Sequence, residues 1–190
     1  MILPTSNSNG DDDVHTAHQG ESFELLHEDV QRWVWDQGWN TLRPIQEEAI
    51  PLIIEGDSDV ILSAPTASGK TEAAFLPILS RIINQRDARE SSSQGFDVVY
   101  ISPLKALIND QYERLQDLCD VCDLPVHRRH GDVSSSKKRK VLKDPDGVLL
   151  ITPESVEALF LRQPTVFHQA LQWVSYLVVD EVHSFIGTPQ

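Results

Sequence analysis

The residues best suited to chemistry form a short loop that could hold phosphate groups. The segment APTASGKT at residues 64–71 matches the pattern G-x-x-x-x-G-K-[ST], except that Ala64 replaces the first glycine. In such a loop the backbone N–H groups face nucleotide phosphates, the lysine neutralises the β and γ oxygens, and the final hydroxyl can ligate Mg²⁺. The predicted nucleotide-binding residues of the loop are Thr66, Ala67, Ser68, Gly69, Lys70 and Thr71.

A pair of carboxylates further along the chain could complete this site. Asp180 and Glu181 directly follow an apolar run. A carboxylate at the carboxyl end of a parallel strand lies in the crevice where α/β sheets bind ligands. There Asp180 would hold Mg²⁺, directly or through water, and Glu181 would polarise an attacking water. Taken alone, such a pair is more often an exposed turn, and the preceding phosphate loop is what makes it indicate nucleotide hydrolysis.

The elements that must position these residues alternate along the chain. Short apolar, β-branched runs predict strands at 59–63, 97–102, 147–152 and 176–180, and helices are expected at 71–85, 104–120, 134–143 and 154–162. An amphipathic stripe from Phe23 predicts a further helix that ends at Gly38, and another helix begins near Pro44. The runs do not alternate polar with apolar residues, so we expect strands covered on both faces. The predicted fold class is α/β, with a parallel β-sheet flanked by helices.

Composition and charge limit the classes of protein that this chain could be. Its 190 residues include 29 acidic and 16 basic side chains, and the net charge of −13 argues against a protein that holds nucleic acid by bulk positive charge. Residues 1–20 are predicted to be a disordered acidic tail, and residues 21–190 a single domain. Because no signal or long apolar segment stands out, we expect a soluble, cytoplasmic protein with no membrane partner. The two cysteines provide no disulfide framework.

Five ordered segments between residues 23 and 190 resemble those of a known family. They are LRPIQ at 42–46, APTASGKT at 64–71 (motif I), ISPLKAL at 101–107 (motif Ia), ITPES at 151–155 (motif Ib) and DEVH at 180–183 (motif II). The chain is similar to the first RecA-like domain of a superfamily 2 DEAD/DEAH-box helicase, closest to the large helicase-related (Lhr-like) group. The resemblance implies a RecA-like P-loop NTPase domain that uses ATP and Mg²⁺ to move along DNA or RNA.

The resemblance also implies roles for individual residues. Gln46 would read the adenine edge with Arg43 nearby, and His183 would couple the nucleotide site to the region that follows motif II. A nucleic-acid strand, most simply a single strand, would contact Ser102, Pro103, Lys105, Thr152, Pro153 and Glu154. Such contacts to phosphates set position without reading sequence. The family usually has glycine where Ala67 stands, and alanine is expected to fit if its φ is negative.

The chain stops seven residues after His183, so motif III and a second RecA-like domain are missing from it. It would then be a fragment, a truncated product, or half of a pair completed in cis or in trans. Without the arginine that a second domain supplies, the isolated chain is expected to be nearly inactive. One alternative is a non-catalytic module that binds ATP and nucleic acid and needs a partner domain for turnover. Another is a P-loop enzyme with a small-molecule substrate, which motifs Ia and Ib disfavour.

Three weaker patterns have both a functional and an ordinary interpretation. A zinc site could be formed by Cys119, Cys122, His127 and His130. Their spacing matches neither a zinc finger nor a zinc knuckle, which favours an ordinary structural role without metal. The basic stretch 128–143 is either a solvated helix face or an auxiliary phosphate contact. Among the tryptophans near Gln46, Trp39 could stack on adenine, although such residues more often belong to the core.

Overall fold

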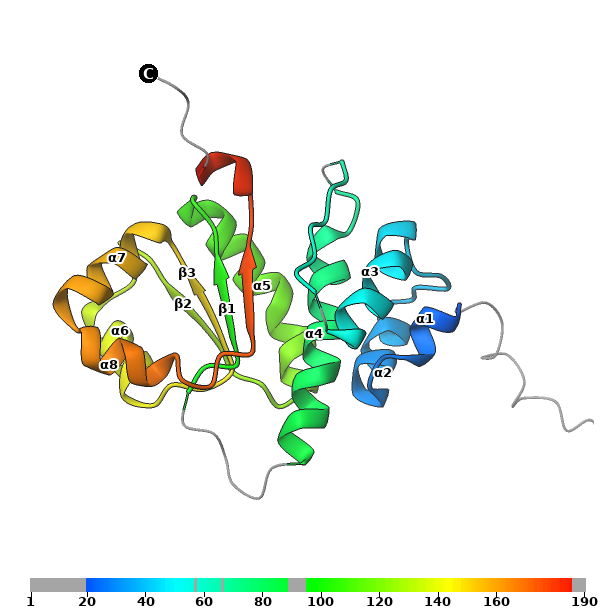
Figure 1. Ribbon diagram of the computed structural model, residues 1–190, viewed down its shortest axis with the longest axis horizontal. Helices are drawn as coiled ribbons and strands as arrows, with labels where there is room; N and C mark the ends of the chain where they lie inside the picture. Colours follow the sequence, from blue (N-terminus) through cyan, green and yellow to red (C-terminus); the bar gives the residue numbers. More distant parts are fainter. Residues whose placement is uncertain (1–19, 57, 66, 89–94, 186–190) are drawn as a thin grey trace, which may run out of the picture.

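A computed structural model describes residues 20–56, 58–65, 67–88 and 95–185, and shows a parallel sheet between two layers of helices (Figure 1). The strands are β1 (Val98–Ile101), β2 (Val126–Arg129), β3 (Val148–Ile151) and β4 (Tyr176–Val179), in the spatial order β2-β3-β1-β4. All three pairings are parallel. The predicted α/β class is therefore confirmed.

Helices cover the two faces of the sheet in chain order. On one face α4 (Lys70–Asp87) and α5 (Lys105–Val121) lie next to the sheet. Helices α1 (Glu21–Glu24), α2 (Glu28–Asp36) and α3 (Pro44–Glu55) lie on the side of α4 and α5 away from the strands (Figure 1). The other face carries α6 (Ser135–Lys143), α7 (Pro153–Arg162) and α8 (Pro164–Ala170), and the 3₁₀ turn η1 (Val182–Phe185) follows β4 (Figure 1). On β1, Val98 and Tyr100 join the first core cluster while Val99 joins the second, so successive side chains serve opposite cores.

Most predicted elements are present with shifts of a residue or two at their ends. Helices α4 to α7 match the expected helices, and β1, β3 and β4 match three of the expected strands. The stripe that starts at Phe23 forms two helices, α1 and α2, and Gly38 follows α2 with a φ of +71°. Strand β2 and helix α8 were not predicted, because VHRR lacks an apolar run and α8 is only seven residues long.

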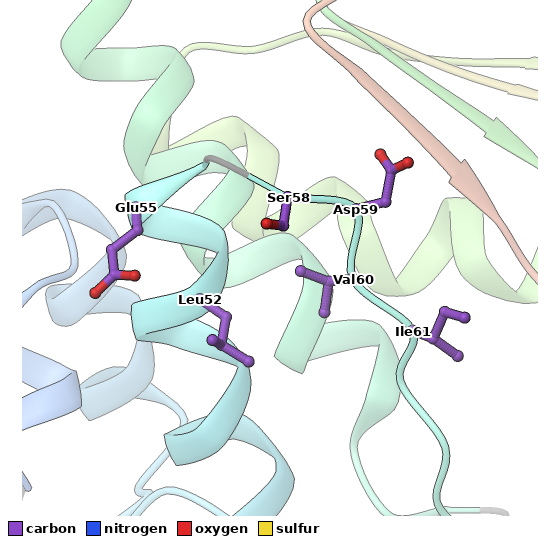
Figure 2. A pocket seen from close by; sticks show the side chains of 6 residues that line it. All are labelled: Leu52, Glu55, Ser58, Asp59, Val60 and Ile61. Atoms are coloured by element: carbon purple, nitrogen blue, oxygen red, sulfur yellow. The ribbon is translucent and has the colours of Figure 1, made fainter.

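The predicted strand at 59–63 is wrong. The segment is extended but pairs with no strand in the described part of the chain. Val60 and Leu62 pack against the first core cluster, whereas Ile61 is 89% exposed. Figure 2 shows Val60 and Ile61 pointing to opposite sides of this segment, beside a small hollow that it forms with Leu52 and Glu55 of α3. The alternation of a strand is thus present, but the neighbouring strand that a ladder requires is not among the described residues.

The expectation that every strand is covered on both faces is also wrong for β4. Its Tyr176 and Val178 pack against the first core cluster, but Leu177 and Val179 are 62% and 41% exposed. The second core cluster takes strand side chains from β1 and β3 and none from β4, because α6, α7 and α8 lie over the β2 and β3 end of that face and leave the β4 edge uncovered (Figure 1). The apolar run of β4 therefore did not reveal that one of its faces is open.

A buried ion pair ties α4 to the amino-terminal end of the sheet. Arg86 of α4 donates a 2.5 Å hydrogen bond to Asp97, which is 2% exposed, and also contacts Asp146. Burial would lower the pKa of Arg86, but the hydrogen bonds and charges of Asp97 and Asp146 raise it overall. Residues 1–19, and with them nearly all of the predicted tail, lie outside the described residues. No helix in the described ranges is long and apolar enough to span a bilayer.

Candidate functional site

The phosphate loop leads directly into α4, as its sequence predicts. Gly69 caps the helix with a φ of +89°, and Lys70 is the first helical residue. The Lys70 ammonium donates hydrogen bonds to the carbonyl oxygens of Ala64 (2.7 Å) and Pro65 (3.0 Å), so its charge lies against the loop itself. Thr71 follows in the first turn, where helix N–H groups lack partners within the helix. Thr66 lies outside the described residues.

Ala67 does not adopt the backbone angle that we expected. Its φ is +61°, in the left-handed region, where a Cβ costs an L-residue about 1–2 kcal/mol. The guanidinium of Arg43 donates a hydrogen bond to the Ala67 carbonyl, which holds the turn from outside. The condition under which alanine was expected to fit is therefore not met, and a hydrogen bond from the Ser68 N–H to the Pro65 carbonyl at 3.3 Å closes the turn.

Gln46 and Arg43 lie directly against this loop. A Cβ on Gly69 would come within 2.8 Å of Gln46 Nε2 and 3.0 Å of Arg43 Cδ, so only glycine leaves room for them. The Gln46 side chain is 1% exposed, and its Oε1 accepts a 2.9 Å hydrogen bond from the Arg43 backbone N–H. Its Nε2 is buried and has no partner among the described residues. Trp39 packs against the first core cluster, and its ring lies edge-on to that of Trp33 with 5.5 Å between the ring centroids. This agrees with the interpretation of Trp39 as a core residue.

The acidic pair is held at the carboxyl end of β4. Tyr100 on β1 donates a 2.5 Å hydrogen bond to Asp180 Oδ2, and the Glu181 backbone N–H donates to Oδ1 at 2.9 Å. Burial, and next the hydrogen bond to Asp180, raise the pKa of Tyr100. Glu181 has a φ of +50°, and its carboxylate lies 3.3 Å from Nδ1 of the exposed His183.

The loop and the acidic pair lie at the same end of the sheet. In Figure 1 the turn before α4 and the red η1 segment both lie at the top, where the strands end. Among the residues that the structure describes, no hydrogen bond or ion pair joins Lys70 or Thr71 to Asp180. The fold thus brings the two motifs to the same end of the sheet, the carboxyl end at which α/β sheets bind ligands.

Most of the predicted nucleic-acid contacts line a second feature, a groove of about 790 Å³. Pro103 and Lys105 form part of one side, and Thr152 and Glu154 at the start of α7 form part of another. Lys105 is paired with Asp132 at 2.9 Å. Ser102 is fully buried, with its hydroxyl unpartnered within the described residues, and Pro153 does not line the groove.

The groove also contains basic residues that the site prediction missed. They are Arg129 at the end of β2, Lys138 and Arg139 on α6, and Arg162 on α7. The basic stretch at 128–143 was a sequence signal for the first three, although four of its seven cations do not line the groove. No sequence signal pointed to Arg162, since it joins the others only because the fold brings α7 and α6 to the same groove.

The zinc interpretation gains no support from the described residues. No group of three or more His, Cys, Asp or Glu side chains there could hold a metal ion. Cys119 and Cys122 are free, buried thiols. Burial raises the pKa of both, that of Cys122 to about 12, so neither is a ready thiolate ligand.

A RecA-like sheet with a phosphate loop and a carboxylate pair at its carboxyl edge defines the class of this chain as a P-loop NTPase domain. The DEAD/DEAH box helicase family model matches residues 43–189, and the chain belongs to that family. It is 39% identical to the ATP-dependent helicase Lhr-Core of Saccharolobus solfataricus over 88% of this chain and 20% of that protein. It is 34% identical to the Escherichia coli Lhr helicase/uracil glycosylase over 67% of this chain and 9% of that one.

Solved structures give the same result. The Mycobacterium smegmatis helicase Lhr, bound to single-stranded DNA and AMP-PNP, matches with a TM-score of 0.70 and 30% identity over 87% of this chain and 21% of its own. The DEAD-box helicase Mss116 matches with a TM-score of 0.75 at 21% identity, over 86% of this chain and 32% of that one. At this low identity the match shows a shared fold only. The chain spans about a fifth of the length of the Lhr-Core helicases that it matches.

Proposed function

We propose that residues 21–190 form the ATP-binding half of an ATP-dependent helicase or translocase that acts on DNA or RNA. One observation carries this proposal: the buried, unpartnered Nε2 of Gln46 lies against Gly69 of the phosphate loop. A buried amide donor without a partner costs free energy that a ligand acceptor recovers. An adenine ring presents such an acceptor, and a ring placed beside Gln46 and Arg43 would have its phosphates next to the loop.

The remaining residues of the site fit ATP and Mg²⁺. Ser68, Gly69, Lys70 and Thr71 would surround the phosphates, with the Lys70 ammonium leaving the loop carbonyls for phosphate oxygens. Bound Mg²⁺, held by Thr71 and Asp180, would neutralise negative charge on the phosphates. Glu181 would accept a proton from the attacking water, and the neighbouring His183 would couple the site to the following region.

We further propose that a single strand of nucleic acid contacts Ser102, Pro103, Lys105, Thr152, Pro153 and Glu154. Four of these line the groove, and the M. smegmatis relative is a complex with single-stranded DNA. A second RecA-like domain, in cis or in trans, would supply the arginine that stabilises charge on the γ-phosphate, a contribution of about 10³–10⁵ in rate. The buried thiols are suited to the reducing cytoplasm, where we place the protein.

Titration of the chain with a fluorescent ATP analogue in the presence of Mg²⁺ tests the nucleotide site. Lys70→Ala is expected to abolish binding, because a charge-assisted contact to phosphate is lost. Gln46→Ala is expected to remove the preference for ATP over GTP, while Glu181→Gln keeps binding. Lys105→Ala is the matched control for a lost cation, and it should bind ATP as the unaltered chain does. Equal affinities for Lys70→Ala and Lys105→Ala would contradict the assignment.

A phosphate-release assay separates the helicase half from a self-sufficient enzyme. The 190-residue chain is expected to hydrolyse ATP near background, with little stimulation by single-stranded DNA or RNA. Turnover of about 1 s⁻¹ that depends on nucleic acid, within the ordinary range for enzymes, would show that no second domain is required.

A further inference from the structure

The groove beside motifs Ia and Ib has a side that no helicase motif supplies. Arg129, Lys138, Arg139 and Arg162 line it, and we call these four residues the basic wall. The one carboxylate among the groove-lining residues is Glu154. The cation on the motif side, Lys105, already has Asp132 as a partner at 2.9 Å. The uncompensated positive charge of the groove therefore belongs to the basic wall.

Arg129 is the most constrained member of the basic wall. Its Nη1 donates a 2.9 Å hydrogen bond to the carbonyl oxygen of Lys138, and it has no carboxylate partner in the described ranges. Burial lowers the pKa of its guanidinium. A partly desolvated cation without an anion is costly, and the cost is recovered when an anion binds.

Helix α6 presents two different basic faces. Ser135, Lys138, Arg139 and Leu142 line the groove, with the i, i+3, i+4, i+7 spacing of one helix face. The Lys138 ammonium donates a 2.9 Å hydrogen bond to the Gly131 carbonyl, and buried Leu142 anchors the helix on the second core cluster. Lys137 and Lys140 do not line the groove, and the helical period places them on the opposite face. Lys138 is thus held in place on the groove face, with the exposed Arg139 beside it on the same helix face.

We propose that the basic wall binds phosphates of the nucleic-acid strand, so that the strand runs between α6 and α7 as well as over motifs Ia and Ib. This inference rests on the proposed function, because it extends the same track. The basic wall lines the same groove as Lys105 and Thr152, two of the proposed nucleic-acid contacts. A strand bound there would therefore place its backbone phosphates next to the wall. None of the described residues that line this groove is aromatic, so bases find no stacking platform among them. The wall therefore reads charge and not sequence.

The basic wall also explains how a strongly acidic chain could hold a polyanion. The net charge of −13 repels nucleic acid as a whole, whereas four cations gathered in one groove act at short range. Salt screens interactions beyond about 10 Å at 0.1 M, which weakens the repulsion by distant carboxylates more than contacts inside the groove.

Fluorescence anisotropy with a labelled single-stranded oligothymidylate, measured over a range of salt concentrations, tests the inference. The variant Lys138→Ala/Arg139→Ala removes two groove cations, and Lys137→Ala/Lys140→Ala removes two cations from the other face of the same helix. The first is expected to weaken binding by about tenfold or more and to reduce the salt slope by about 1.4, that is, about 0.7 per phosphate contact. The control should stay within about twofold of the unaltered chain, since its net charge changes equally but no contact is lost.

Two further variants separate this inference from the proposed function. Arg162→Ala lies on a different helix and is expected to reduce the salt slope by about 0.7, which supports the wall even if the α6 variant unfolds. Lys105→Ala tests the motif track alone. Weaker binding by Lys105→Ala, with the α6 double variant and Arg162→Ala both equal to the control, would overturn the basic wall and leave the proposed function standing. Unchanged binding in every variant would overturn both.

Discussion

The hydroxyl of Tyr100 donates a 2.5 Å hydrogen bond to the carboxylate of Asp180. Tyr100 is 2% exposed on β1, and its strand pairs in parallel with β4, which ends just before Asp180. The Asp180 backbone N–H also donates to the Ile101 carbonyl at 2.9 Å. The proposed metal ligand is therefore oriented by the neighbouring strand through Oδ2, in addition to the Glu181 backbone N–H that contacts Oδ1. Because the pKa of Tyr100 is raised, its hydroxyl remains a donor throughout the physiological pH range.

Removing this hydroxyl should destabilise the fold measurably. A hydrogen bond to a charged group contributes about 1.5–3 kcal/mol, and Asp180 is only partly buried, so we expect Tyr100→Phe to lower the free energy of unfolding by about 1–2 kcal/mol. The phenyl ring keeps its packing on Phe75. Urea denaturation gives the measurement, with Tyr112→Phe as control, because the Tyr112 hydroxyl accepts its hydrogen bond from the neutral Gln116 amide, at 3.3 Å. Equal losses in the two variants would show that Asp180 draws no support from Tyr100.

Replacing Ala67 with glycine should relieve backbone strain in the phosphate loop. A φ of +61° costs alanine about 1–2 kcal/mol, and glycine avoids this cost. The greater freedom of glycine in the unfolded chain offsets about 0.4–1 kcal/mol of that stabilisation. Ala67→Gly should thus raise the free energy of unfolding by at most about 1.5 kcal/mol. Ala158→Gly in the middle of α7 is the opposite case and should lower it by about 1 kcal/mol. A loss of stability in Ala67→Gly would mean that the loop is not strained.

The pairing of Arg86 with Asp97 should be a major determinant of stability. Arg86→Met leaves the buried carboxylate of Asp97 without its cation, and breaking a buried pair in this way costs about 3–5 kcal/mol. The exposed i, i+3 pair of Arg32 and Asp29 serves as the comparison, and Arg32→Ala should cost only about 0.2–0.5 kcal/mol. Chemical denaturation of the two variants decides the matter, and similar losses would contradict the buried role of Arg86.

Stability should fall as the pH drops below neutrality, in part because of His127. Burial lowers the pKa of this imidazole, although the charge of Asp146 acts in the opposite direction. The unfolded chain therefore binds more protons than the folded chain once the pH falls toward the ordinary histidine pKa of about 6.5, which favours unfolding. The same direction applies to His130, whose pKa burial also lowers.

His127→Gln should accordingly flatten, but not abolish, the loss of thermal stability between about pH 7 and pH 5. The measurement is the melting temperature of both chains at a series of pH values. If the variant and the unaltered chain lost stability in parallel across this window, the His127 imidazole would not be the group that is linked to folding.

The sequence by itself determined the elements whose signals are local. The phosphate loop predicts a helix from residue 71, one residue after α4 begins, Pro44 predicts the start of α3, and the apolar runs predict β1 and β3. Each of these signals is contained in a few consecutive residues: a helix-starting residue, a backbone that only glycine adopts easily, or a side-chain period. For the same reason the order of the five motifs was enough to indicate the family.

Only the tertiary structure decided which distant residues meet. It placed Gln46 against Gly69, joined Tyr100 to Asp180, and gathered Arg129, Arg139 and Arg162 in one groove. It also gave residues 59–63 no strand partner within the described ranges, and gave Ala67 a positive φ. These outcomes depend on strand order and helix packing, which are set by contacts between segments far apart in the chain. A local pattern contains no information about the neighbour that a strand edge, a carboxylate or a guanidinium will find, and that neighbour determines the chemistry of the site.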